Sequence, residues 1–291
     1  MAENKEIETP GSKFTQTLDA AARLPGVRIN RAAYLRAALK RHCSEEQIER
    51  AVAESPAAAG IPFGVITSAA NDSIRYETAK VTALSAAAGI PGGFAVIGMV
   101  PADLAQYFGH VLRIAQKLAY IYSWPNLFAD DGDGNELDDA TEGILTLFVG
   151  VMFGLQLAQG GVAKVANMMA AQALKKLPQQ ALTKGAIYPV VKKVATYLGV
   201  RMTKQIFAGG VAKIIPVLGA VLSGGLTLAT FLPMAKRLQK HLASLELTKP
   251  AHRAEEEEII VAVVVDDVPQ DEFDQSELVD TADSAELVEQ P

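Results

Sequence analysis

An uncharged stretch of 22 residues, positions 214–235, constrains the fold of this chain more than any other feature. A helix of about 20 apolar residues is long enough to cross a lipid bilayer. The middle of the stretch is rich in small residues, among them Gly219, Ser223, Gly224 and Gly225. Small residues spaced four apart let a second helix approach closely. We therefore expect a helix that either inserts into a membrane around these small residues or is the most buried helix of a compact bundle.

Two further runs lack charged side chains, residues 81–102 and residues 143–163. The motif GIPGG at residues 89–93 interrupts the first run, because proline removes a backbone donor and glycine permits positive φ. Apolar residues make up 49% of the chain and aromatic residues only 6%, so the apolar content is mainly Ala, Val, Leu and Ile. This composition favours close-packed helices. We predict an all-α fold, a multi-helix bundle whose apolar helical hairpins are broken by Gly and Pro.

Caps and composition divide the chain into four parts. Residues 1–12 are polar, and we expect them to be disordered. Residues 13–58 are expected to form a small helical unit, in which Asn30 caps one helix and Ser44 forms a capping box with Gln47 at the start of another. Residues 59–248 are expected to form the main helical domain. Residues 249–291 are expected to be an acidic, disordered tail.

The formal net charge of −6 hides an asymmetry along the chain. Residues 255–291 contain fourteen Asp or Glu and no Lys or Arg, whereas residues 164–254 contain fourteen Lys or Arg and a single acid, Glu246. Such a basic region suits an anionic membrane or a nucleic acid. It lacks the interleaved aromatic residues on which bases stack, so we expect lipid head groups and no nucleic acid. The alternative is a solvated face balanced by the acidic tail.

The basic region supplies the candidate residues for binding anionic lipid. They are Lys192, Lys193, Arg201, Lys204, Lys213, Lys236 and Arg237. Basic and amphipathic segments of this kind are typical of helices that lie on a membrane surface, and they are also typical of the outside of a soluble bundle.

The predicted helix at residues 102–124 carries a polar stripe. Its members, Asp103, Gln106, His110, Arg113 and Lys117, recur at spacings of three and four and therefore share one face. Histidine titrates near neutral pH, so Asp103, His110 and Arg113 are the candidates for a catalytic acid–base site. The alternative is a solvated stripe, or polar contacts that tie this helix to a basic neighbour.

The loop after this helix has the ligand spacing of an EF-hand. Asp131, Asp133, Asn135 and Glu142 fall at positions 1, 3, 5 and 12 of such a loop. Glu136 stands where the sharp-turn glycine belongs, so the four residues are weak calcium candidates. The four histidines are scattered, and Cys43 is the single cysteine. We expect no intrachain disulfide, no metal and no cofactor.

Three segments resemble the EcsC family, which is named for a protein encoded beside a bacterial ABC transporter. They are AAAGIPGG with the PADL motif that follows it (residues 86–104), HVLRIAQKLAYIYSW (residues 110–124) and KIIPVLGAVLSGGLT (residues 213–227). The resemblance covers roughly residues 60–245 and rests on small residues and helix breaks. It implies an all-helical, membrane-associated bacterial protein, and no catalytic residues carry over from it.

These features favour one function and leave two alternatives. We expect a membrane-associated helical protein that binds anionic lipid surfaces and inserts its glycine-rich hairpins, in a remodelling, pore or transport-accessory role. The first alternative is a soluble helical scaffold that captures a protein partner through the strip IIVAVVV, which begins at Ile259 and ends at Val265. The second is a hydrolase-like enzyme that uses Asp103, His110 and Arg113, although the motifs G-x-S-x-G and H-E-x-x-H and the P-loop are absent.

The first residues, MAENKEIETPGSK, lack the apolar core of a secretory signal. We therefore expect the protein on the cytoplasmic side, peripheral to the inner membrane or partly inserted in it. The sequence leaves open whether the chain forms a homo-oligomer.

Overall fold

The computed structural model describes residues 9–88, 102–128, 137–172, 175–209 and 216–249, and residues 1–251 form one compact unit. Within the described ranges the chain is helical and has no strand, which confirms the predicted all-α bundle. The helices are α1 (Pro10–Ala22), α2 (Arg31–Leu39), α3 (Glu45–Ala53), α4 (Phe63–Ala88), α5 (Ala102–Ile121), α6 (Asp139–Met152), α7 (Gln156–Ala171), α8 (Gln179–Thr183), α9 (Tyr188–Gly209), α10 (Pro216–Ala243) and the short 3₁₀ helix η2 (Glu246–Thr248). The acidic tail, with Ile259 and Val265, lies outside the described residues.

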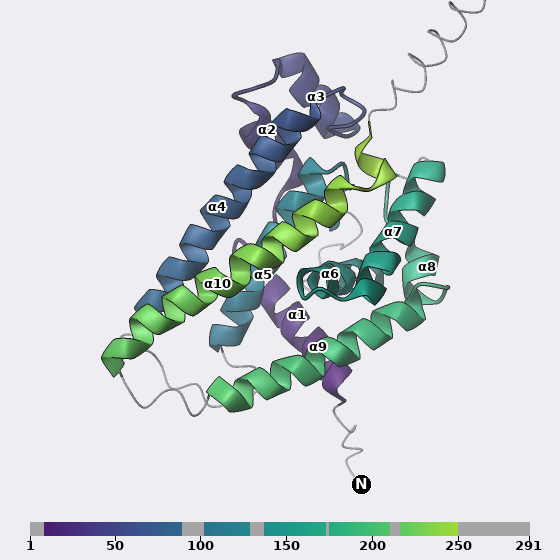
Figure 1. The fold of residues 1–291 in the computed structure, drawn as a ribbon. Helices are drawn as coiled ribbons and strands as arrows, with labels where there is room; N and C mark the ends of the chain where they lie inside the picture. Colours follow the sequence, from purple (N-terminus) through teal and green to yellow (C-terminus); the bar gives the residue numbers. More distant parts are fainter. Residues whose placement is uncertain (1–8, 89–101, 129–136, 173–174, 210–215, 250–291) are drawn as a thin grey trace, which may run out of the picture. The chain divides into compact units, whose positions relative to one another are not determined.

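Helix α6 lies at the centre of the bundle. Residues 143–152 are all buried, and α1, α5, α7, α8, α9 and α10 pack around the helix (Figure 1). A helix that is apolar on all sides is stable only when other elements cover it. The ring of Phe148 meets the buried ring of Trp124 edge to face, with centroids 4.9 Å apart. The first part of the uncharged run 143–163 is therefore protein core.

The uncharged run 143–163 forms two helices, because α6 ends at Met152 and α7 begins at Gln156. Gly154 between them has a φ of +83°, which glycine adopts without strain. The N–H of Leu155 bonds to the Gly150 carbonyl at 3.0 Å, and the N–H of Gly154 bonds to the Val151 carbonyl at 2.9 Å. This is the pattern of a Schellman cap. The sequence analysis did not predict a break at this position of the run.

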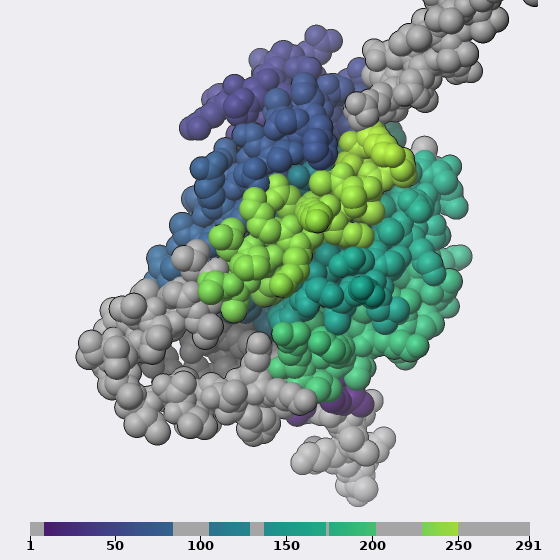
Figure 2. Space-filling view, in the orientation of Figure 1, coloured from purple at the N-terminus to yellow at the C-terminus, as the bar shows by residue number. Residues whose placement is uncertain are grey.

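Helix α10 contains most of the uncharged stretch 214–235. It runs beside α4 in the opposite direction and also packs on α5 and α6 (Figure 1). Figure 2 shows α10 in yellow-green, lying between the blue α4 and the teal and green helices that follow α5. In its described part the buried stripe consists of Phe231, Met234, Ala235, Leu238 and Leu242. This spacing is that of an amphipathic helix with one face in the core.

The small residues of the same stretch belong to α10. Gly219, Ser223, Gly224 and Gly225 lie within its helical turns, and their packing lies outside the described residues. Among the described helices, none combines the length and the apolar character that crossing a membrane requires. The predicted insertion around these residues stays a prediction.

The predicted caps of the N-terminal helices are present. The Asn30 side chain accepts a hydrogen bond from the N–H of Ala33 at 2.9 Å, and Ser44 and Gln47 form a reciprocal capping box at α3. Arg31 donates to the carbonyl oxygen of Val52 at 2.7 Å, close to the end of α3. The last carbonyls of a helix lack partners within it, so this side chain stabilises the end of α3.

Helix α1 packs against α9 and α5, and the α2–α3 pair contacts α5 and α4. The contact between α1 and α9 is close, because a Cβ atom on Gly199 would lie 1.7 Å from the carbonyl oxygen of Pro10. Only glycine fits at such a backbone approach. The N-terminal helices thus share interfaces with the main bundle, and the domain boundary at residue 58 stays a prediction.

Candidate functional site

Helix α4 places a carboxylate in the protein core. Its buried face contains Ile66, Ala70, Ile74, Glu77 and Val81, at spacings of three or four residues. The Glu77 side chain is 0% exposed. A buried charge is tolerated only when it is paired and hydrogen-bonded, so this position requires positively charged partners.

Three basic residues of α5 supply these partners. Lys117 Nζ lies 2.6 Å from Glu77 Oε1, and Arg113 Nη2 lies 3.2 Å from the same oxygen. His110 Nδ1 lies 3.2 Å from Glu77 Oε2. The three side chains reach one carboxylate because they are spaced three and four residues apart on α5. Much of the polar stripe predicted on this helix is therefore a contact with α4. We call these four residues the Glu77 cluster.

The Glu77 cluster keeps its carboxylate ionised. Burial raises the pKa of Glu77, but the hydrogen bonds from His110, Lys117 and Arg113 lower it by more, and the result is a pKa of about 2 against an ordinary 4.5. The Lys117 ammonium also lies 5.0 Å from the centroid of the Tyr76 ring, which favours a cation at that position. At neutral pH the cluster is therefore an ion network that joins α4 to α5.

The turn between α1 and α2 covers one end of this network. Arg113 Nη1 donates to the carbonyl oxygen of Gly26, whose φ is +73°. The buried Gln116 donates to the Val27 carbonyl at 3.0 Å and accepts from the N–H of Ile29 at 2.7 Å. All these bonds go to backbone atoms of the turn. They therefore fix the position of the turn on α5 whatever side chains it carries.

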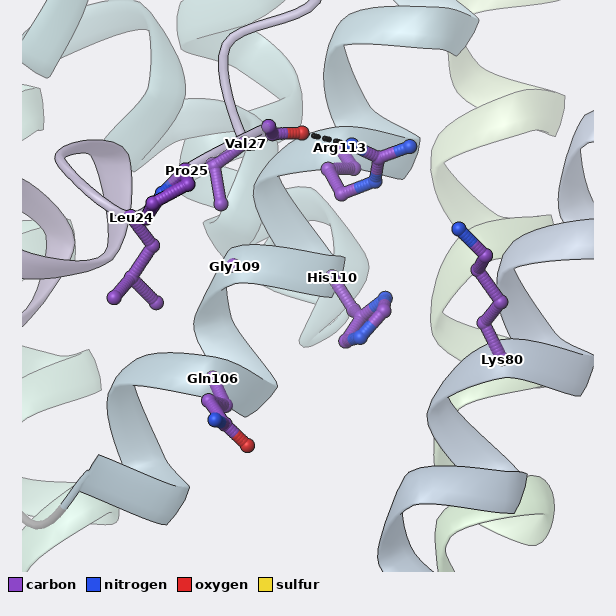
Figure 3. Close-up of a pocket in the computed structure, with 9 residues that line it drawn as sticks. Leu24, Pro25, Val27, Lys80, Gln106, Gly109, His110 and Arg113 are labelled. Atoms are coloured by element: carbon purple, nitrogen blue, oxygen red, sulfur yellow. Dashed lines mark hydrogen bonds between the residues drawn. The ribbon is translucent and has the colours of Figure 1, made fainter.

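A pocket of about 300 Å³ lies between this turn, α4 and α5 (Figure 3). The turn contributes its apolar side with Leu24, Pro25 and Val27. The polar side comes from Lys80 on α4 and from Gln106, His110 and Arg113 on α5. Figure 3 shows that Lys80 projects from α4 opposite the residues of α5. No acidic side chain is among the described residues that line the pocket, so the pocket is electropositive.

The contact with Glu77 orients the imidazole of His110. A ring nitrogen that bonds to a carboxylate carries the hydrogen, so Nδ1 donates to Glu77 and Nε2 remains for solvent or a ligand. This geometry suits a general base. No Ser, Thr or Cys is found among the described lining residues, so this part of the pocket has no hydroxyl or thiol nucleophile for a covalent mechanism. The side chain of Asp103 lies outside the described residues, and the hydrolase-like hypothesis stays a prediction.

A second candidate site is the exposed side of α9. Its buried side is formed by Val191, Val194, Ala195 and Leu198. The opposite side consists of Lys192, Lys193, Thr196, Tyr197, Val200 and Arg201, all exposed, and we call these six residues the α9 face. Tyr197 and Val200 are 45% and 40% exposed, which makes them two of the few large apolar side chains of the described chain that face solvent. The α9 face therefore combines cations with apolar surface.

Two of the three basic side chains of the α9 face, those of Lys192 and Arg201, rest on aromatic rings, and none of the three pairs with an acid in the described part of the chain. Lys192 Nζ lies 4.8 Å from the centroid of the Tyr188 ring. The Arg201 guanidinium lies 5.5 Å from the Phe153 ring and donates to the Tyr197 hydroxyl at 3.3 Å. The sequence has no Asp or Glu between residues 143 and 245. These contacts thus position the cations without neutralising them.

The other predicted lipid-binding residues are placed differently. Lys236 Nζ donates to Asn71 and, at 3.0 Å, to Gln239. Arg237 donates to the Met152 carbonyl at 3.3 Å and so satisfies the C-terminal end of α6. Both side chains of α10 are therefore bonded to the bundle itself. The side chains of Lys204 and Lys213 lie outside the described residues.

The calcium prediction falls largely outside the described residues, because Asp131, Asp133 and Asn135 all lie there. Glu142 lies in the first turn of α6, where burial, with the nearby charges of Asp139 and Asp19, raises its pKa. Within the described ranges no group of three His, Cys, Asp or Glu side chains is arranged to hold a metal ion. The calcium hypothesis stays a prediction.

Comparisons of the chain with protein-family models, with curated proteins and with solved structures give no match. The resemblance to the EcsC family therefore stays a prediction from the segments quoted above. The function has to be argued from the geometry and charge of the two candidate sites.

Two residues of the first site were missed by the sequence analysis, Glu77 and Lys80. Glu77 occupies the core-facing register of α4 between Ile74 and Val81, and a charged residue in that register indicates a buried partner. That signal was available in the sequence. Lys80 gave no signal, because an exposed lysine on a helix is typical of a solvated surface.

Proposed function

We propose that the protein binds anionic membrane surfaces peripherally, through the α9 face. The observation that carries this proposal is that basic and apolar side chains are exposed on the same side of one helix. The basic ones are Lys192, Lys193 and Arg201, and the apolar ones are Tyr197 and Val200. Helices that lie in the membrane interface have this combination of basic and apolar side chains. The cytoplasmic leaflet, which carries the anionic lipids, is the expected target.

The charges of the α9 face attract it to an anionic surface. Each Lys or Arg near an anionic surface contributes roughly 1 kcal/mol, so the three basic residues give about 3 kcal/mol. Partial burial of Tyr197 and Val200 in the head-group region adds to this.

Peripheral binding is the form of membrane association that the packing favours. The uncharged residues of α6 are covered by other helices, and binding through the α9 face requires none of them to leave the core. Insertion of the glycine-rich hairpins would instead expose the core to lipid and break contacts on several helices. Remodelling and pore formation are therefore not part of the proposal.

The test is co-sedimentation with vesicles, either neutral or containing about one-third phosphatidylserine. Replacing both Lys192 and Lys193 with Glu should weaken binding to the anionic vesicles by at least about 30-fold, because each reversal removes one attraction and adds one repulsion. The matched control is Lys40→Glu with Arg41→Glu, two adjacent exposed cations in the turn after α2. Equal losses in both double variants, or no binding of the unmodified protein to anionic vesicles, would overturn the proposal.

A further inference from the structure

We propose that the pocket between α4, α5 and the α1–α2 turn binds a phosphate group, carried either by a small soluble phosphate or by a lipid head group. This site is separate from the α9 face and does not depend on it. The pocket holds hydrogen-bond donors from Lys80, Gln106 and Arg113 and no described acidic side chain. A phosphate has several acceptor oxygens and a negative charge, so it complements this set of donors, two of which are positively charged.

Arg113 keeps donors for a ligand although it already makes three contacts. A guanidinium has five N–H groups in a planar fork. Nε and Nη2 donate to Glu77, and Nη1 donates to the Gly26 carbonyl. One N–H on each terminal nitrogen is therefore left over. Since Glu77 and Gly26 hold the fork in place, a ligand meets an arginine that is already ordered, and pre-organisation of this kind strengthens binding.

Lys80 supplies the second cation. Its ammonium lies 4.9 Å from the centroid of the Tyr76 ring, and no ion pair to an acidic side chain is recorded for it in the described part of the chain. It stands on α4, across the pocket from His110 and Arg113 (Figure 3). A ligand in the pocket is therefore approached by donors from two helices. A planar carboxylate can be bound by a single arginine through two parallel hydrogen bonds. A tetrahedral oxyanion presents oxygens in several directions, so donors on opposite sides of a pocket suit it better.

The charge balance favours an anion. Among the described residues, Glu77 is the carboxylate that His110 and Arg113 contact, and its side chain is fully buried. Lys80, Arg113 and Lys117 carry one charge each, so positive charge remains in excess after Glu77 is paired. An electropositive, partly enclosed cavity concentrates anions and strengthens their interactions relative to bulk water.

The size of the pocket limits the ligand. A volume of about 300 Å³ lies at the lower end of the range for small-molecule sites. The apolar side, formed by Leu24, Pro25 and Val27, leaves room beside the phosphate for a short apolar or polyol group. A phosphate monoester, or the head group of a phosphatidic acid, fits both halves of this description.

The test uses the full chain and two probes, inorganic phosphate in titration calorimetry and phosphatidic acid in neutral vesicles. Lys80→Gln removes a pocket cation that takes no part in the Glu77 contacts, so the fold is expected to persist, and circular dichroism checks this. The Lys80→Gln substitution should weaken phosphate binding by at least about tenfold, since charge-assisted hydrogen bonds are stronger than those between neutral groups. Lys40→Gln, an exposed lysine after α2, is the matched control.

The two probes distinguish the sources of the phosphate. Saturable binding of inorganic phosphate that depends on Lys80, but not on Lys40, supports a soluble ligand. The same dependence with phosphatidic acid vesicles alone supports a lipid head group. No binding of either probe, or equal binding by Lys80→Gln and the unmodified chain, overturns the proposal. The double reversal of Lys192 and Lys193 should leave the titration with inorganic phosphate unchanged, which separates this site from the α9 face.

Discussion

The Glu77 cluster and the α9 face each bring three basic residues together, but in opposite environments. In the cluster, the side chains of His110, Arg113 and Lys117 are 13%, 18% and 11% exposed, and they share one carboxylate. On the α9 face the three cations are exposed, and Lys192 and Arg201 rest on aromatic rings, in a stretch of chain that has no acid. The same residue types therefore join two helices in one place and remain open to a partner in the other.

The difference lies in what surrounds the charges. In a buried site, removal of one member leaves the others uncompensated in a medium of low polarity, and this costs several kcal/mol. On the surface, water and salt screen the charges, so removing one costs the fold almost nothing. Substitutions in the Glu77 cluster should therefore change stability, whereas substitutions in the α9 face should change binding. The predictions below test that separation.

The largest expected effect is that of Glu77→Gln. The substitution keeps the shape of the side chain but removes the charge that compensates Lys117 and Arg113, so we expect a loss of about 3–5 kcal/mol in the free energy of unfolding. Urea denaturation followed by circular dichroism measures it. Glu49→Gln is the control, since Glu49 pairs with Arg36 at the surface, where water screens the pair, and its substitution should cost far less than that of Glu77. Similar losses for the two variants would contradict the role of burial.

The pH dependence of stability provides a second test of the cluster. Because the pKa of Glu77 is lowered to about 2 from an ordinary 4.5, the folded state holds this proton less tightly than the unfolded state. The resulting stabilisation, about 3 kcal/mol, is fully present above pH 4.5 and is lost as the pH falls from 4.5 towards 2. Urea midpoints of the unmodified chain and of Glu77→Gln should therefore converge on acidification. If the difference between the two urea midpoints stayed the same at pH 7 and at pH 3, the ionised Glu77 carboxylate would not be the source of the stabilisation.

A single substitution made in both regions sharpens the comparison. Lys117→Met leaves Glu77 with two partners and should cost about 1–3 kcal/mol of unfolding free energy, because Lys117 makes the shortest contact with the carboxylate, at 2.6 Å. Lys193→Met on the α9 face should change stability by less than about 0.5 kcal/mol. The same two variants should show the reverse order in binding to anionic vesicles. If both variants lost equal stability, the α9 face would have a structural role that its exposure does not indicate.

Local signals along the chain were predictable. Asn30 and the Ser44–Gln47 box cap their helices as expected, because a cap depends only on residues within one turn. The GIPGG motif lies outside the described residues, so the helix break expected there stays a prediction. The polar stripe on α5 was also correct as a periodic pattern. For the caps the decisive interaction is between residues close in sequence, and the stripe follows from the helical repeat alone.

What was not predictable depends on contacts between distant residues. His110 and Arg113 were expected beside Asp103 on their own helix, whereas their described partner is Glu77, which comes 33 residues before His110. The pocket needs, in addition, the turn at Gly26, held by a bond from Arg113 across 87 positions. The sequence also could not separate the predicted lipid-binding residues that stay exposed from those that bond to the bundle. Arg237, for example, donates to the Met152 carbonyl at the end of α6, 85 residues earlier in the chain. The spacing of residues along the sequence predicts which of them share a face of a helix, but it does not predict which other helix packs against that face.

The smallest expected effect separates the apolar part of the α9 face from its charges. Tyr197→Ala removes a ring that is 45% exposed, so the fold should be unaffected, and binding to anionic vesicles should weaken only about three- to fivefold. Co-sedimentation at about 0.1 M and about 0.5 M NaCl then distinguishes the two terms, because salt screens the lysines but not the ring. The factor lost with Tyr197 should persist at high salt, while the factor lost with Lys193→Met should shrink. Phe63→Ala, at a side chain 53% exposed on α4, is the control, and an equal loss there would mean that any exposed aromatic residue contributes and that the α9 face is not the binding surface.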